Sequence, residues 1–241
     1  MFDTLLLSVL AGLATLVGAL IIAAFGKPSA KTLAVFFGLA AGMMFSVVTT
    51  DLIPSSLEYG SLKTLLLGFV FGIVLLKILN KILVYLNRKN KNSTNSYLRR
   101  MGYLISIGIA LHDLPEGIAI AAGFSADTKL GWLLSIAIGL HNIPEGMVTA
   151  APLYMSGLSV RRILSIVGLV SIFTPIGTLI GLIIVSISPL YISFLLAMAA
   201  GAMSYIVFWE IVPESRKHHP NYAFCGMILG FVVILLLGVL E

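Results

Sequence analysis

The sequence is poor in charge: only 10% of its 241 residues are Asp, Glu, Lys or Arg, whereas soluble globular domains carry about 25%. Hydrophobic residues make up 59% of the chain, and its mean hydropathy is +1.07. This composition excludes a soluble globular protein and indicates an integral membrane protein.

Cysteine and nucleotide-binding motifs are also scarce. The single cysteine, Cys225, cannot form an intrachain disulfide, and we expect it to be a small packing residue. Nothing in the sequence predicts a soluble module, a nucleotide-binding loop or a nucleic-acid surface. A self-contained ATP-driven pump is therefore excluded.

Long apolar stretches fill nearly the whole chain, and a spanning helix needs roughly 20 apolar residues. We expect one all-α membrane domain, residues 1–241, in which a polar, low-complexity segment at about 87–99 forms a flexible cytoplasmic loop. The eight expected transmembrane helices cover residues 4–25, 32–54, 62–86, 100–124, 130–155, 162–186, 189–212 and 221–240.

The net charge of +5 comes mainly from alternate connections between these spans. Basic residues concentrate on the cytoplasmic side of membrane proteins. Only Lys63 and Lys129 fall on the other side, so we expect a multi-pass protein of the cell membrane with both termini outside the cytoplasm. The basic residues of the cytoplasmic connections are Lys27, Lys31, Lys77, Lys81, Arg88, Lys89, Lys91, Arg99, Arg100, Arg161, Arg162, Arg216 and Lys217.

Two parts of the chain repeat one another. The sequence AGMM at 41–44, followed by DLIP at 51–54, matches AGAM at 200–203, followed by EIVP at 210–213, and GFV occurs further on in both. Spans 1–3 therefore resemble spans 6–8, and because each span lies five spans before its counterpart, the copies run in opposite directions. We expect the inverted 3+2+3 repeat found in many transporters; chance similarity among glycine- and alanine-rich helices is the alternative.

The two central spans carry nearly identical motifs, HDLPEG at 112–117 and HNIPEG at 141–146. At 3.6 residues per turn, the histidine and the glutamate of each motif lie one turn apart on one helix face. The proline between them lacks an amide donor, which leaves the carbonyl four residues earlier available to a cation.

Acidic side chains inside the bilayer need compensation. Asp113, Glu116 and Glu145 fall within the central spans, and three such acids cost on the order of 8 to 10 kcal/mol unless they are paired, protonated or bound to cations. The surrounding His, Asp, Glu and Asn side chains suit Zn²⁺, Fe²⁺, Mn²⁺ or Co²⁺. We therefore predict a metal site, with a proton relay or a hydrogen-bonded core as alternatives. Its residues are His112, Asp113, Glu116, His141, Asn142 and Glu145.

Two further acids, Asp51 and Glu210, are expected near the outer face, where they would attract cations to a metal entrance. The alternative is that each simply faces interfacial water before a helix-terminating proline. His218 and His219 stand beside Arg216 and Lys217, and we expect them to be solvated loop residues rather than ligands.

The twin motifs, together with DLIP and EIVP, resemble the ZIP family of divalent-metal transporters, particularly its GufA-like and ZupT-like prokaryotic branch, over essentially the whole chain. The resemblance implies two neighbouring metal sites. The primary site would use His112, Glu116, His141 and Glu145, and the adjoining site would use Asp113 and Asn142, with both glutamates as bridges.

This chain departs from the family pattern in four places. Thr174 stands before Pro175, where members of this branch often carry a glutamate, which would weaken the adjoining site. The asparagine common in the first motif is Asp113, and an acid seen in some second motifs is Asn142. A histidine-rich cytoplasmic loop is missing, so metal sensing by such a loop is not expected.

The function implied by the resemblance is transport of Zn²⁺, or of Fe²⁺, Mn²⁺, Co²⁺ or Cd²⁺, into the cytoplasm by alternating access. Spans 1, 4, 5 and 6 would move against spans 2, 3, 7 and 8, often in a homodimer. The metal would be the substrate, no cofactor is expected, and the surroundings would be the lipid bilayer. Clustered carboxylates would hold some protons until metal displaces them.

Two other functions stay open. An intramembrane metallohydrolase would need an open metal position and a base for water, but it has no use for a near-symmetric pair of motifs. A proton-coupled transporter of another solute is the second alternative, and its flux would not depend on metal binding by His112 and His141.

Overall fold

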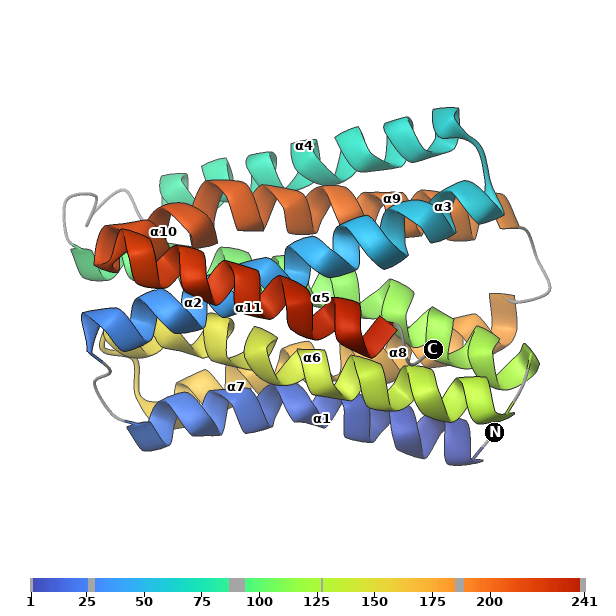
Figure 1. Cartoon of the computed structure of the whole chain (residues 1–241), viewed down its shortest axis with the longest axis horizontal. Coiled ribbons are helices and arrows are strands. Elements are labelled where there is room, and N and C mark those ends of the chain that lie inside the picture. Colours follow the sequence, from blue (N-terminus) through green and yellow to red (C-terminus); the bar gives the residue numbers. More distant parts are fainter. Residues whose placement is uncertain (1, 26–28, 87–93, 127, 185–188, 239–241) are drawn as a thin grey trace.

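The computed structural model describes residues 2–25, 29–86, 94–126, 128–184 and 189–238, which form helices and no strand (Figure 1). This agrees with the expected all-α class. The helices are α1 (Phe2–Phe25), α2 (Ala30–Val47), η1 (Val48–Leu52), α3 (Ile53–Tyr59), α4 (Leu62–Leu86), α5 (Thr94–Ala126), α6 (Thr128–Met155), α7 (Val160–Ser171), α8 (Phe173–Ile184), α9 (Pro189–Ile206), η3 (Val207–Ile211), α10 (Val212–His218) and α11 (Pro220–Gly238).

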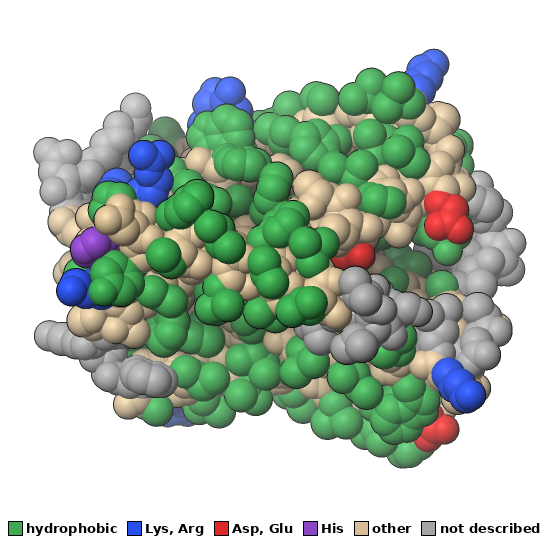
Figure 2. Space-filling view, in the orientation of Figure 1, with side chains coloured by type: hydrophobic (Ala, Val, Ile, Leu, Met, Phe, Trp, Pro, Cys, Tyr) green, Lys and Arg blue, Asp and Glu red, His purple; other side chains and the backbone are tan. Residues whose placement is uncertain are grey.

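Within the described ranges, six helical stretches are long and apolar enough to cross a membrane. They coincide with the first four, the sixth and the seventh expected spans. The fifth expected span coincides with α6, of 28 residues, and the eighth with α11, whose described apolar part is Pro220–Leu236. Hydrophobic side chains cover most of the face seen in Figure 2, as a lipid-facing surface requires.

Two span boundaries differ from expectation. Helix α5 begins at Thr94, so it takes in the second half of the expected loop 87–99, where Leu98 is buried. Residues 87–93 lie outside the described ranges. The sixth span is interrupted at Ile172, between α7 and α8, just before Pro175, which has no amide to continue the α-helical ladder.

Cys225 is exposed, so its expected packing role is wrong.

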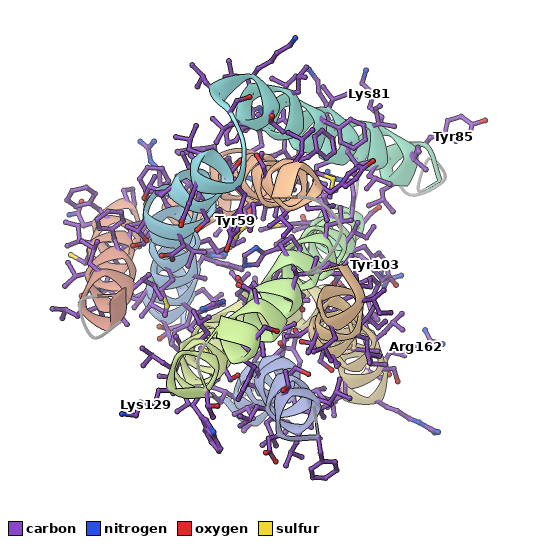
Figure 3. The ribbon with its side chains drawn as sticks, turned by 90° about the vertical axis from the view of Figure 1, so that its right-hand side faces the viewer. Tyr59, Lys81, Tyr85, Tyr103, Lys129 and Arg162 are labelled. Atoms are coloured by element: carbon purple, nitrogen blue, oxygen red, sulfur yellow. The ribbon has the colours of Figure 1, made fainter. Side chains whose placement is uncertain are left out.

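Helix α5 lies near the middle of the bundle, and α4 lies at its edge (Figures 1 and 3). The most extensive helix pairs are α2 with α11, α1 with α6, α4 with α9, and α5 with both α8 and α6. Small residues permit these approaches: a Cβ built on Gly42 would lie 2.0 Å from the backbone oxygen of Met227, and one on Gly201 would lie 2.0 Å from that of Phe69.

The chain from α2 to α3 runs antiparallel to the chain from α9 to α10. At one end of the bundle, Ser56 and Ser193 each donate a side-chain hydrogen bond to the other's carbonyl oxygen. At the other end, the Ser215 hydroxyl donates to the Ala34 carbonyl. The first of these ends is on the right of Figure 1.

Each of these two chain segments contains one π-helical turn before its proline. In η1, the side chains of Thr49 and Thr50 donate to the carbonyls of Phe45 and Ser46, which supplies hydrogen bonds that the widened backbone loses. The acids Asp51 and Glu210 occupy the same place in η1 and η3. Both π turns therefore present a carboxylate.

Replacing Gly42 with Ala should destabilise the protein, whereas replacing Gly168 with Ala should not. Both changes add helix propensity of about 0.8–1.0 kcal/mol. At Gly42, however, the new methyl group would clash with backbone, at a cost of roughly 1–3 kcal/mol, while at Gly168 the nearest atom is 3.8 Å away. Thermal unfolding in detergent would measure this, and equal midpoints for the two variants would contradict the packing described here.

Candidate metal centre

The HDLPEG and HNIPEG motifs meet where α5 packs against α6. The Glu116 Oε1 atom lies 2.6 Å from His112 Nε2 and 2.5 Å from His141 Nε2, so one carboxylate oxygen sits between the two imidazoles. Glu145 Oε1 lies 3.7 Å from His112 Nε2. Two histidines and two glutamates thus converge from two helices.

Burial makes this convergence costly without a further cation. None of the six predicted site residues is more than 7% exposed. Several of their polar atoms have no hydrogen-bond partner among the described residues: both Asp113 carboxylate oxygens, Glu116 Oε2, Glu145 Oε2, Asn142 Oδ1 and His112 Nδ1. A buried polar group without a partner costs about 1–3 kcal/mol, and more when it is charged. A metal ion would satisfy such oxygens.

The geometry suits a small divalent ion. His112, His141 and Glu145 each offer a ligand atom, and these atoms lie within 4.8 Å of one another. At Zn–N distances of about 2.0–2.1 Å, two ligands of a tetrahedral zinc ion lie about 3.3 Å apart. Side-chain adjustments of about an ångström would bring these atoms to that spacing.

The neighbouring helices hold the motifs in place through close backbone approaches. The glycine of each motif permits this: a Cβ on Gly117 would lie 2.0 Å from the Thr174 oxygen of α8, and one on Gly146 would lie 1.8 Å from the Thr15 oxygen of α1. Asn142 Nδ2 also donates to the Ala11 oxygen of α1 at 2.9 Å, which fixes the amide and leaves its Oδ1 for the site. Thr174 is buried, and its hydroxyl has no hydrogen-bond partner among the described residues.

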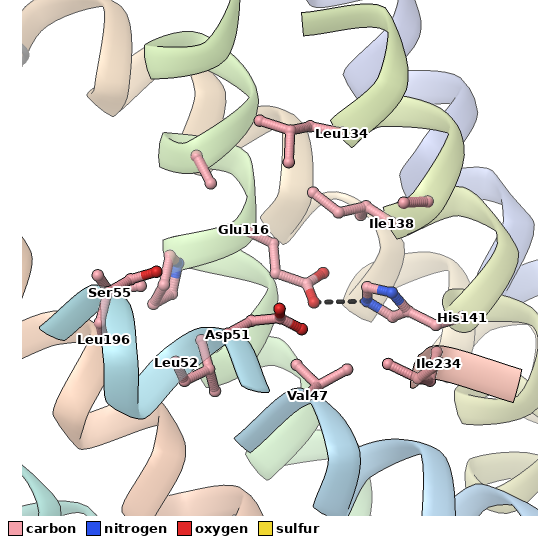
Figure 4. A pocket seen from close by; sticks show the side chains of 13 residues that line it. Val47, Asp51, Leu52, Ser55, Glu116, Leu134, Ile138, His141, Leu196 and Ile234 are labelled. Atoms are coloured by element: carbon pink, nitrogen blue, oxygen red, sulfur yellow. Dashed lines mark hydrogen bonds and ion pairs between the residues drawn. The ribbon is translucent and has the colours of Figure 1, made fainter. Parts of the chain in front are cut away.

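A cavity of about 200 Å³ reaches this centre, and Asp51, Glu116 and His141 line it together (Figure 4). A second cavity of about 230 Å³ shares part of its wall, through Ser55, Pro115, Ala119, Leu134 and Leu196. The second cavity extends to Tyr59, the last residue of α3, and to Ile192, near the start of α9. These ends of α3 and α9 lie on the right of Figure 1. Asp51 thus lies beside a path between that end and the centre.

Glu210 lies elsewhere, so the expectation that it stands near the outer face with Asp51 is wrong. Because the segments that carry the two acids run antiparallel, equivalent positions fall at opposite ends of the bundle. Glu210 is 2% exposed and forms an ion pair with Arg100, whose Nη1 lies 3.3 Å from Glu210 Oε1. Asn80 Nδ2 donates to the same oxygen at 3.3 Å.

The expectation that both later histidines are solvated loop residues is wrong for His218. His218 is the last residue of α10, its side chain is only 19% exposed, and its ring stacks on Phe37 at 6.1 Å. His219 packs edge-on against Tyr222 at 4.7 Å. In place of the expected loop there is a short junction between α10 and α11, and both of these helices pack against α2.

Comparison with known proteins finds that the sequence of this chain is similar to those of zinc transporters. The model of the ZIP zinc transporter family matches residues 86–238. The zinc transporter ZupT of Enterobacter sp. (strain 638) is 33% identical to this chain, over 96% of both chains. The zinc transporters ZupT of Escherichia coli O7:K1 and O127:H6 are 32% and 33% identical, again over 96% of both chains.

Replacing Glu116 with Gln should weaken Zn²⁺ binding by at least about 100-fold, since even residues outside the ligand shell cost 10–100-fold and Glu116 contacts both histidines. The matched control is Glu214→Gln, another buried glutamate, which pairs with Lys217 at 3.0 Å. Calorimetry on purified protein would measure both. Equal affinity in the two variants would show that the centre does not bind zinc.

Proposed function

Because the chain belongs to the ZIP family of zinc transporters, we propose that it carries Zn²⁺ across the cell membrane through the centre between α5 and α6. The observation that supports this most strongly is a buried set of two histidines and two glutamates at the end of a cavity. A metallohydrolase and a transporter of another solute account less well for two copies of one ligand set in a chain of this family.

The proposed ligands fall into two groups. His112, His141, Glu116 and Glu145 would hold the transported ion, and Fe²⁺, Mn²⁺, Co²⁺ and Cd²⁺ suit the same donors. Asp113 and Asn142, with the second oxygens of the two glutamates, would form the adjoining site. Since the residue before Pro175 is Thr174 rather than a carboxylate, this adjoining site would bind metal less tightly than the primary one.

The proposed architecture is eight spans in an inverted 3+2+3 repeat. Three observations support the repeat: η1 and η3 are both π-helical, each contains an acid, and the two segments run antiparallel. Ser56 and Ser215, which lie 159 positions apart as Asp51 and Glu210 do, both donate to a carbonyl of the opposite segment. Both termini would lie outside the cytoplasm, and the homodimer stays a prediction.

The two halves of the proposed path differ in packing. Corresponding positions of α5 and α6 are 29 residues apart, as His112 and His141 are. Ala119 lines the cavity and is half-buried, but its counterpart Val148 is 2% exposed. Leu134 is likewise half-buried, but its counterpart Ile105 has no exposed surface.

This difference in packing supports an outward-facing state, in which metal reaches the centre from the outside through the cavity that Asp51 lines. Release to the cytoplasm would then need the tightly packed half to open. Uptake by alternating access follows, with α1 and α5–α8 moving against the other helices. Since metal replaces protons on such ligands, binding would release protons.

Zn²⁺ influx into proteoliposomes should be abolished by Glu145→Ala, because the ion loses a ligand at the centre. Asp51→Asn should only reduce influx, because it removes an attracting charge from the cavity wall and leaves the ligands intact. Glu58→Ala serves as the control, since Glu58 is exposed and lies outside the cavity linings described above. Influx that persists unchanged in Glu145→Ala would rule out transport through this centre.

A further inference from the structure

A partly buried polar network links three helices at the end of the bundle opposite the cavity. Both carboxylate oxygens of Glu210 face the Arg100 guanidinium, at 3.3 Å for Oε1 to Nη1 and 3.5 Å for Oε2 to Nη2. Asn80 accepts from Arg100 Nη1, donates to Glu210, and donates to the Tyr205 hydroxyl at 2.9 Å. The network joins α4, α5 and the segment formed by α9 and η3.

The position of this network is informative. Arg100 lies twelve residues before His112 on α5, which places it about 18 Å from the metal centre along the helix, at 1.5 Å per residue. Under the proposed orientation this is the cytoplasmic end. Between the network and the centre the packing is tight: a Cβ on Gly108 would lie 1.9 Å from the Ile206 side chain.

We propose that the ion pair of Arg100 with Glu210 is a latch that closes the cytoplasmic path in this outward-facing state. This inference rests on the proposed transport function. In the proposed motion, α5 belongs to the moving helices, whereas Asn80 and Glu210 belong to the other group. The pair must therefore break each time the cytoplasmic path opens.

The repeat supplies the opposite latch. Lys129 lies twelve residues before His141 on α6, as Arg100 does before His112, and Asp51 corresponds to Glu210. In this structure Asp51 is exposed on the cavity wall. When the cytoplasmic latch breaks and the outer cavity closes, Lys129 would pair with Asp51. Each carboxylate would thus hold a basic side chain in one state and be open to the path in the other.

This exchange has a physical reason. Removing a partner from a buried ion pair leaves an uncompensated charge, which is strongly unfavourable. When the inner pair breaks, water from the opened path would hydrate Glu210, and the metal leaving the centre would offset its negative charge. Formation of the outer pair would compensate the charge of Asp51. Arg100 is a positioning residue in this scheme, since it controls access and does not contact the transported ion.

Cysteine accessibility tests the latch with a matched pair of reporters. Ala119→Cys lies on the outer path, and Val148→Cys occupies the corresponding position on the inner side; both are placed in a Cys225→Ser background. A membrane-impermeant maleimide is applied to right-side-out vesicles for position 119 and to inside-out vesicles for position 148. Without further changes, we expect position 119 to react and position 148 to be protected.

Arg100→Gln should raise the labelling rate at position 148 by at least about tenfold, because it leaves the buried Glu210 charge uncompensated, and should lower the rate at position 119. Glu210→Gln should shift both rates in the same senses, and the exchange Arg100→Glu with Glu210→Arg should restore the parent rates. Adding Lys129→Gln should reverse part of the effect of Arg100→Gln, since the inward-facing state then loses its own latch.

The control is Arg99→Gln, since the neighbouring Arg99 donates to the Ser156 backbone oxygen rather than to a carboxylate. It should leave both rates unchanged. Labelling that rises at both positions in Arg100→Gln would indicate general loosening and overturn the latch, as would unchanged rates. The labelling assay needs no metal, so it tests the latch separately from the substrate. Unchanged labelling rates in a protein that transports Zn²⁺ would refute the latch alone. If the parent protein carries no Zn²⁺ but Arg100→Gln still raises labelling at position 148 and lowers it at position 119, only the proposed substrate would be refuted.

Discussion

Burial of carboxylates inside an apolar bundle is the constraint on which this structure depends. Asp113, Glu116 and Glu145 lie deep among helices that face lipid, and several of their oxygens have no hydrogen-bond partner within the described residues. Each acid at mid-membrane costs about 2.5–3.5 kcal/mol if nothing compensates it. The two histidines compensate part of this charge, and a divalent cation would compensate the rest. A buried centre with unpartnered polar atoms that a cavity reaches suits the transport of a cation.

Close helix packing determines where the buried acids lie relative to the cavity. Glycines at the motif ends bring α1 and α8 against the ligand helices, and other glycines bring α2 and α4 against α11 and α9. The two π-helical segments then present their acids at opposite ends, Asp51 on an open cavity wall and Glu210 in a buried ion pair. The two halves of the bundle therefore differ: one has a cavity that Asp51 lines, and the other has an ion pair between Glu210 and Arg100.

Much of this could be predicted from the sequence, because hydropathy predicts where the long helices lie and motif spacing predicts which helix faces carry the histidines and glutamates. The convergence of the histidines and glutamates agrees with prediction, since both motifs have one helical period. The predicted location of Glu210 near Asp51 is wrong, although the predicted inverted repeat already implies that the two acids lie at opposite ends of the bundle. The Arg100 and Asn80 contacts could not be predicted, because they depend on how α4 and the start of α5 pack. The start of α5 at Thr94 was missed because a polar composition predicts a loop even where Leu98 is buried.

The central claim is that the metal lies between α5 and α6, held by both motifs. Anomalous X-ray diffraction above and below the zinc absorption edge, from crystals grown with Zn²⁺, tests it most directly. We predict a zinc peak within coordinating distance, about 2.0–2.2 Å, of His112 Nε2, His141 Nε2 and at least one oxygen each of Glu116 and Glu145. Zinc peaks confined to other residues, with the two histidines bonded only to Glu116, would contradict the account.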